Sequence, residues 1–163
     1  MRKISLILVL LFIASCNKKK SEKPVPFFKF DEVIHYQIDD EDTITKLFQV
    51  SQSDRTESDE EFFKILMEYN YPISVSDSSF FKSLETLYPI KNHIPKSLFT
   101  ELSTIFSQSN IGNSTEYACD PFFRDVFIFK NNSKIIGVAK ICFECEKKSL
   151  VGAKGETLNF GAK

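Results

Sequence analysis

The chain has 163 residues, of which 42% are hydrophobic, and it contains 17 phenylalanines and no tryptophan. This length and apolar content are sufficient for one folded domain with its own core. The formal net charge is −1, and electrostatic binding of nucleic acid needs a clustered excess of lysine and arginine, so the composition argues against a nucleic-acid-binding protein.

The N-terminus has the features of an export signal. Arg2 and Lys3 form a positively charged start, and residues 4–13 form an apolar run of signal-peptide length, shorter than a membrane span. Residues 13–16 are an aliphatic residue, two small residues and Cys16. This pattern resembles the lipobox of bacterial lipoproteins, in which the cysteine is diacylated before cleavage. An ordinary secretory peptide that happens to contain a cysteine is the alternative.

The lipobox resemblance implies a location as well as a modification. Residues 1–15 are expected to be cleaved as a signal peptide, and residues 16–26 to form a lipidated, flexible tether rich in lysine. Asn17 stands where an aspartate would favour retention in the inner membrane, so we expect an outer-membrane anchor facing the periplasm. Residues 27–163 are then expected to form a single globular domain.

In the first part of that domain the sequence predicts one strand, and it leaves one segment undecided between strand and helix. Residues 32–38 alternate with a period of two, which is typical of a half-buried strand, and His35 lies on the face opposite its apolar neighbours. The acidic residues 39–42 lack the spacing and glycine of a calcium-binding EF-hand and are interpreted as a solvated turn. Residues 43–50 fit either a second strand or a short helix.

Three short helices are predicted next. A Ser-x-x-Glu capping box that begins at Ser58 predicts a helix over residues 58–69. Asp77 is expected to cap a second helix over residues 78–88. A proline at the first helical position predicts a third over residues 96–108. Their apolar stripes indicate core packing rather than a cofactor site.

A β-hairpin is predicted in the C-terminal part of the chain. The β-rich runs 126–129 and 135–141 flank an Asn-Asn-Ser sequence at 131–133, where asparagine tolerates the left-handed backbone of a tight turn. Residues 157–160 are expected to add a short edge strand or to fray. The predicted fold is therefore an α+β domain, in which a small antiparallel sheet with a C-terminal hairpin packs against about three short helices.

The hairpin gathers the three cysteines that remain after Cys16. If Lys130 pairs with Ser133, the numbers of paired residues in the two strands sum to 263. Cys119 then lies across from the segment between Cys142 and Cys145, and a slip of one or two residues places it opposite either one. An oxidising compartment favours pairing of thiols, and an odd number leaves one of them over.

Three interpretations of these cysteines remain open. In the first, Cys119 bonds to Cys142 or Cys145 and stabilises the hairpin by about 3 kcal/mol. In the second, the Cys-x-x-Cys sequence is a redox pair, although it ends a strand and precedes a glutamate, whereas a redox pair begins a helix. In the third, the three thiols bind zinc or copper(I), with His93 or His35 as the fourth ligand.

Arg124 immediately precedes the first hairpin strand and is a candidate for binding charge. We interpret it as the ion-pair partner of Asp125, Glu144 or Glu146, with a bound anion as the alternative. A buried pair of this kind costs desolvation and is not evidence of function.

A family resemblance rests on these C-terminal residues. The sequence Cys-x-Pro-x-x-Arg-Asp before a strand, and the ending Lys-Ile-Cys-Phe-Glu-Cys, resemble the C-terminal part of a group of small uncharacterised bacterial lipoproteins. The resemblance covers residues 119–145 and agrees with the lipobox. The group has no established activity, so the resemblance implies a class and a location without a mechanism.

The sequence favours a binding protein over an enzyme. It has no Ser-His-Asp order, phosphate-binding glycine loop or His-rich metal motif, and no residue is assigned a catalytic role. We therefore predict a membrane-anchored, non-enzymatic protein with a binding or structural role, which contacts another component of the cell envelope. The alternative is a periplasmic thiol-redox or soft-metal protein that works through Cys119, Cys142 and Cys145, with zinc or copper as its cofactor.

Overall fold

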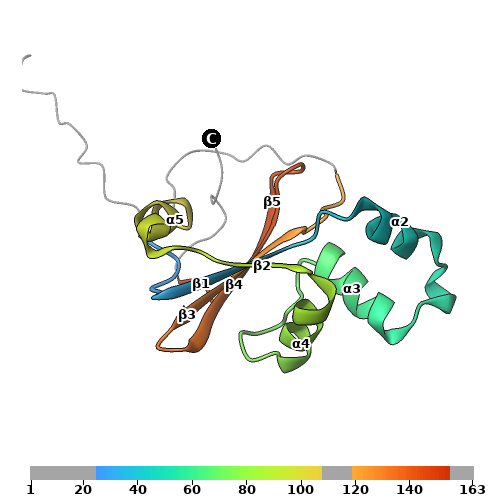
Figure 1. The fold of residues 1–163 in the computed structure, drawn as a ribbon, viewed down its shortest axis with the longest axis horizontal. Coiled ribbons are helices and arrows are strands. Elements are labelled where there is room, and N and C mark those ends of the chain that lie inside the picture. The colour runs from blue at the N-terminus through green and yellow to red at the C-terminus, as the bar shows by residue number, and fades with distance from the viewer. Residues whose placement is uncertain (1–24, 108–118, 155–163) are drawn as a thin grey trace, which may run out of the picture.

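The computed structural model describes residues 25–107 and 119–154, and these form an α+β fold (Figure 1). Their five strands make one antiparallel sheet in the order β2-β1-β3-β4-β5, which confirms the predicted fold class. The strands are β1 (Glu32–Gln37), β2 (Ile90–His93), β3 (Asp125–Asn131), β4 (Lys134–Cys142) and β5 (Lys147–Val151). The α-helices are α2 (Glu41–Gln49), α3 (Glu57–Met67), α4 (Ser78–Leu87) and α5 (Phe99–Ile105).

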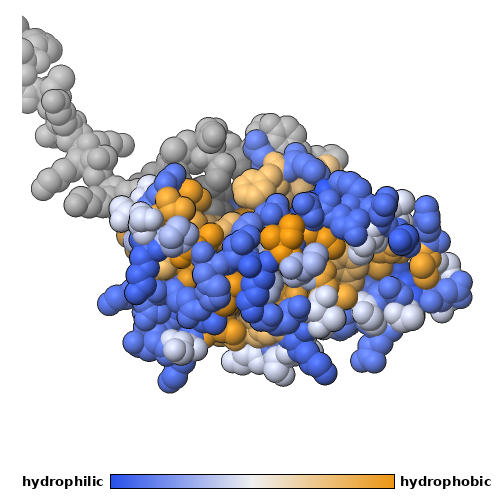
Figure 2. Space-filling view, viewed as in Figure 1, coloured by the Kyte–Doolittle hydropathy of each residue, from blue (hydrophilic) through white to orange (hydrophobic). Residues whose placement is uncertain are grey.

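Helices lie on both faces of the sheet. In Figure 1, α3 and α4 lie on one side of the strands, α5 lies on the other, and α2 extends beyond the end of the sheet. Side chains alternate between the two faces of a strand, so Ile34 and Tyr36 of β1 point to α3 and α4, and Val33 points to the α5 side. Figure 2 shows hydrophilic residues over most of the visible surface, with hydrophobic residues in smaller patches between them.

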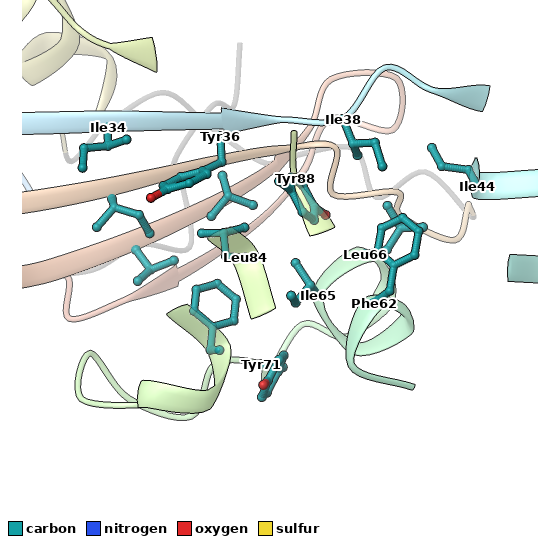
Figure 3. Close-up of a cluster of buried hydrophobic side chains, with 14 of the residues drawn as sticks. Ile34, Tyr36, Ile38, Ile44, Phe62, Ile65, Leu66, Tyr71, Leu84 and Tyr88 are labelled. Carbon is teal, nitrogen blue, oxygen red and sulfur yellow. The ribbon is translucent and has the colours of Figure 1, made fainter. Parts of the chain in front are cut away.

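The larger of two main hydrophobic clusters lies between the sheet and helices α2, α3 and α4. Figure 3 shows aliphatic and aromatic side chains from β1 meeting those of the three helices. Helix α3 contributes Phe62, Ile65 and Leu66, which are at most 4% exposed. Their spacing of three and four residues is the one that places side chains on a single face of a helix.

The second cluster lies on the opposite face and is mainly aromatic. Phe28, from the segment before β1, stacks on Phe129 of β3 with ring centroids 4.3 Å apart. Phe106, which follows α5, meets Phe129 edge to face at 5.0 Å. A core made largely of phenylalanine explains the composition, because these rings fill the layer between a sheet and a short helix.

Phe28 packs directly against Gly137 of β4. A Cβ atom on residue 137 would overlap the ring of Phe28, which lies directly over the glycine. We expect Gly137→Ala to lower the free energy of unfolding by about 1–3 kcal/mol, because the added methyl group would push the buried ring away from its contacts with Phe129 and Phe106. Chemical denaturation followed by circular dichroism measures the change.

A double-mutant cycle tests the cause of that loss. In a Phe28→Leu background the ring is absent, and the cost of Gly137→Ala should fall by at least half. An unchanged cost in that background would show that the methyl group conflicts with something other than Phe28.

The predicted helices are present, with changes at their ends. Helix α3 is capped by Thr56, whose hydroxyl accepts from the Asp59 N–H at 3.2 Å while Asp59 accepts in return from the Thr56 N–H. The predicted capping box beginning at Ser58 is therefore wrong. The earlier start adds a helical hydrogen bond, because the Glu60 N–H donates to the Thr56 carbonyl at 3.0 Å. Asp77 caps α4 as predicted, by accepting from the Phe80 N–H.

Two other segments resolve questions that the sequence left open. Residues 43–50, undecided between strand and helix, lie mostly in α2, which is capped by the carboxylate of Asp40. The predicted helix over 96–108 is a single 3-10 turn, Lys96–Leu98, followed by the short α5. Residue 108 and the expected strand at 157–160 lie outside the described residues, and the strand that follows the hairpin is β5.

The hairpin turn contains two residues. Asn131 pairs with Lys134 and Lys130 with Ile135, so the register is shifted by two residues from the pairing of Lys130 with Ser133 considered above. Asn132 and Ser133 form the turn with φ of 49° and 61°, which is the left-handed backbone that a tight hairpin requires.

Candidate functional site

The structure brings the three C-terminal cysteines to one end of the sheet. Cys119 and Cys145 form a disulfide, with their Cα atoms 6.2 Å apart. Cys142 is the free cysteine among the described residues, and it packs in a small buried cluster with Cys145 and Phe123. Of the two pairings that the sequence allowed for Cys119, the structure therefore contains the one with Cys145.

The turn between β4 and β5 determines this arrangement. Strand β4 ends at Cys142, whose backbone pairs with Lys147 at the start of β5. The chain reverses between them, and Glu146 takes a positive φ of 53°. Cys145 thus lies in the turn itself. The Cys-x-x-Cys pair is therefore at the end of a strand and not at the start of a helix, where thioredoxin-like pairs lie.

Phe123 connects the disulfide-bonded segment to the helical core. Its N–H donates to the carbonyl of Leu66 at the end of α3, at 2.8 Å. Its carbonyl accepts from the buried hydroxyl of Tyr88 at 2.6 Å. Burial raises the pKa of Tyr88, so the phenol stays protonated and donates. The segment that carries Cys119 is therefore held by hydrogen bonds as well as by the disulfide.

Lys140 of β4 is a buried lysine beside the cysteine cluster. Its Nζ donates to the carbonyl of Ile65 at 2.9 Å, and also to that of Glu68, at the C-terminal end of α3. It lies 4.5 Å from the centroid of the Phe123 ring. The last carbonyls of a helix have no partner within it and carry partial negative charge, so Lys140 acts as a C-terminal cap supplied by another element.

Lys140 was not predicted to be buried, although the sequence contains a signal for it. By strand alternation it shares a face with Val138 and Cys142, both of which are buried. A lysine within such an apolar row must find acceptors inside the protein. Burial lowers the pKa of Lys140 to about 7. A lysine of such low pKa can act as a nucleophile or base in principle, but this one is fully buried and occupied by the helix end.

Arg124 pairs with a residue that the sequence did not suggest. Its guanidinium binds the carboxylate of Glu41 at the start of α2, which raises the pKa of Arg124. The prediction that Arg124 directly contacts Asp125, Glu144 or Glu146 is therefore wrong. Glu144 attracts Arg124 more weakly, at longer range. The reason is that the loop before β3 turns its arginine toward α2, which is distant in sequence.

His35 has a partner of its own. Its Nε2 lies 2.7 Å from a carboxylate oxygen of Asp125, and its ring stacks on Phe127 at 4.4 Å. His35 is aligned across the sheet with Ala139, whereas Cys142 lies three residues further along β4 and so faces the other side. His35 therefore does not meet the cysteines.

His93 is also apart from the cysteine cluster. It lies on the edge strand β2, its side chain is 66% exposed, and its Nδ1 is 3.6 Å from Glu32. Neither histidine is in place as a fourth ligand, and the disulfide occupies two of the three thiols. Within residues 25–107 and 119–154, no group of three or more His, Cys, Asp or Glu side chains is placed to hold a metal ion.

Comparisons of this chain with protein-family models, curated proteins and solved structures give no match. The resemblance to small bacterial lipoproteins therefore stays a prediction. In the described part of the chain, every helix is too short or too polar to cross a membrane.

Proposed function

We propose that this protein is a lipid-anchored component of the bacterial cell envelope, with a folded domain held at the outer membrane and facing the periplasm. The observation that carries the proposal is the sequence of residues 13–16, which ends an apolar run and places two small residues before Cys16. The lysine-rich residues 17–23 that follow are suited to a solvated tether beside a membrane.

We further propose a binding or structural role for the domain rather than catalysis. Support comes from three polar side chains near the cysteines, each of which makes a structural contact. Lys140 caps α3, Arg124 pairs with Glu41, and the Tyr88 hydroxyl binds the chain at Phe123. These contacts join α2 and α3 to the disulfide-bonded segment.

Replacing Cys16 tests the anchor. The wild-type protein should incorporate labelled palmitate and fractionate with membranes, and Cys16→Ser should lose the label and become soluble, because the thiol that carries the acyl chains is absent. Cys142→Ala is the matched control, since it also removes a thiol but leaves the lipobox intact. Equal labelling of Cys16→Ser and the wild type would contradict the proposal.

Crosslinking in intact cells tests the binding role. The anchored protein should be recovered in a complex with a defined envelope component, which mass spectrometry identifies. If no crosslinked partner is recovered while the protein is folded and membrane-bound, the domain does not act as a binding module.

A second candidate function, thiol–disulfide exchange, rests on the position of Cys142 against the disulfide. Its thiolate can attack the sulfur of Cys145, which forms a Cys142–Cys145 bond and releases Cys119 as a thiolate that takes up a proton. The exchange needs no external oxidant, and it leaves a reactive thiol at the exposed Cys119.

Mapping of the free thiol separates the two candidates. For a structural disulfide we expect Cys142 to be the unmodified thiol of the folded protein, and to react with an alkylating agent only after unfolding, because it is buried. Rapid alkylation of Cys119 in the folded protein, together with a Cys142–Cys145 peptide in the mass spectrum, would favour exchange.

A further inference from the structure

A hollow of about 420 Å³ lies at the end of the sheet where the β3–β4 hairpin turns. It is remote from the cysteines, which lie where β4 ends and β5 begins. Three segments that are distant in sequence surround it: residues 27–29 before β1, the hairpin turn, and the chain just after β5. The described lining residues are Phe27, Phe28, Lys29, Asn131, Asn132, Lys134, Ile136, Gly152 and Lys154.

The rim of the hollow is positively charged. Lys29, Lys134 and Lys154 are all exposed, and none of the three ammonium groups has a carboxylate within 4 Å among the described residues. No aspartate or glutamate is among the described lining residues. The carboxylate of Asp31 lies nearby, where it accepts from the Asn132 N–H at 2.9 Å. It offsets part of the positive charge, so the described residues around the hollow keep a positive balance.

Hydrogen bonds join the three segments that carry the lysines. The side-chain amide of Asn131 donates to the carbonyl of Lys29 at 2.9 Å, which ties the first segment to the hairpin. The N–H of Lys154 donates to the carbonyl of Phe27 at 3.0 Å, which ties the third segment to the first. The three segments that carry the lysines are therefore joined, so anion binding needs ordering of the lysine side chains but not of the backbone segments.

The walls and floor of the hollow are partly apolar. Phe27 and Phe28 are buried in the aromatic cluster, and Ile136 is half-buried beside them. A ligand that suits both features has a compact anionic group for the lysines and an apolar portion adjoining it. A phosphate-bearing lipid headgroup, with the first carbons of its chains, has this character.

The position of the hollow in the chain also favours a lipid. Phe27 and Phe28 follow the proposed tether, and at about 3.5 Å per residue an extended segment from Cys16 to Phe27 spans no more than about 40 Å. An acylated Cys16 would thus keep the hollow within reach of the headgroup layer. We propose that this hollow binds the phosphate-bearing headgroup of an anionic lipid and so orients the domain on the membrane. The proposal rests on the lipid anchor proposed above.

Vesicle binding by a protein without acyl chains tests the hollow separately from the anchor. The mature full chain carrying Cys16→Ser should sediment with vesicles of phosphatidylglycerol and phosphatidylethanolamine, and less with vesicles of phosphatidylcholine. The triple change Lys29→Gln, Lys134→Gln and Lys154→Gln should weaken binding to the anionic vesicles by about tenfold or more, because each cation at such a surface contributes substantially.

The matched control changes three exposed lysines elsewhere on the domain. Lys46→Gln, Lys82→Gln and Lys96→Gln remove the same total charge from the helical part of the protein and keep the tether lysines. Their combined effect should be about threefold or less. Melting curves show whether each variant is folded. The single variant Lys134→Gln, at an exposed hairpin position, gives a second test and should weaken binding by about fivefold.

Three results would overturn the proposal. The three control substitutions could weaken vesicle binding as much as the three substitutions at the hollow, which would indicate that vesicles attract the charge of the whole surface and not this site. Vesicles of phosphatidylcholine could bind as well as anionic ones. Inorganic phosphate at millimolar concentration could displace the protein from vesicles, which would identify a free phosphate site instead. Because the protein in this assay is not acylated, each result is independent of palmitate labelling at Cys16.

Discussion

Replacing Lys140 with methionine should lower the free energy of unfolding by about 2–3 kcal/mol. Methionine keeps the apolar stem and most of the length of the side chain. The loss of stability therefore arises mainly because the buried carbonyls at the end of α3 lose the hydrogen bonds that Lys140 Nζ donates. Lys134→Met, on the same strand but exposed, is the matched control and should change stability by less than about 0.5 kcal/mol. Urea denaturation measures both variants.

The stabilising effect of Lys140 should depend on pH. Burial lowers the pKa of Lys140 to about 7 in the folded protein, whereas the unfolded chain has the ordinary value of 10.5. Between these values the unfolded state binds more protons, so stability contributed by this group rises with pH from about 7 to about 10. The cost of Lys140→Met should therefore increase over that range. A cost that falls as pH rises would show that the charged form is the one the fold favours.

Cys119→Ala should lower the free energy of unfolding by about 3 kcal/mol, because the disulfide closes a loop with a sequence separation of 26 residues. The cross-link restricts the unfolded chain, and its removal restores that conformational freedom. Cys142→Ala removes a buried thiol without breaking the bond and should cost about 1 kcal/mol. Denaturation with and without reductant measures the difference.

The reductant provides an internal check. Reduced wild-type protein should unfold at the midpoint of oxidised Cys119→Ala, while Cys119→Ala itself should not respond to reductant. If reductant destabilised Cys142→Ala no more than it destabilised Cys119→Ala, the cross-link would not be the one between Cys119 and Cys145.

Much of the local structure could be predicted because its causes are close together in the chain. The alternation over residues 32–38 predicted β1, and the two β-rich runs predicted the β3–β4 hairpin. The Asp77 cap predicted the start of α4. Such signals act within a few residues, so they are readable without the fold. The local signal at Ser58 gave the wrong cap for α3, because the structure starts the helix two residues earlier with Thr56.

The edge strands were missed because they depend on partners that are distant in sequence. Residues 90–93 have little strand pattern of their own, and β2 forms because its backbone pairs with β1. In the same way β5 pairs with β4 after a turn that contains Cys145. Sheet edges are stabilised by neighbouring backbone more than by their own side chains, so composition is a poor guide to them.

The sequence by itself predicted β1, the β3–β4 hairpin and the positions of most helices, and it placed the three cysteines near one another. It also contains the lipobox on which the proposed anchor rests. Only the tertiary structure decided that Cys119 pairs with Cys145, that Arg124 pairs with Glu41 and that Lys140 caps α3. It also decided which lysines surround the hollow near the hairpin. The physical reason is range, because helices and turns follow from neighbouring residues, whereas buried charges and disulfides join groups that only the packed fold brings together.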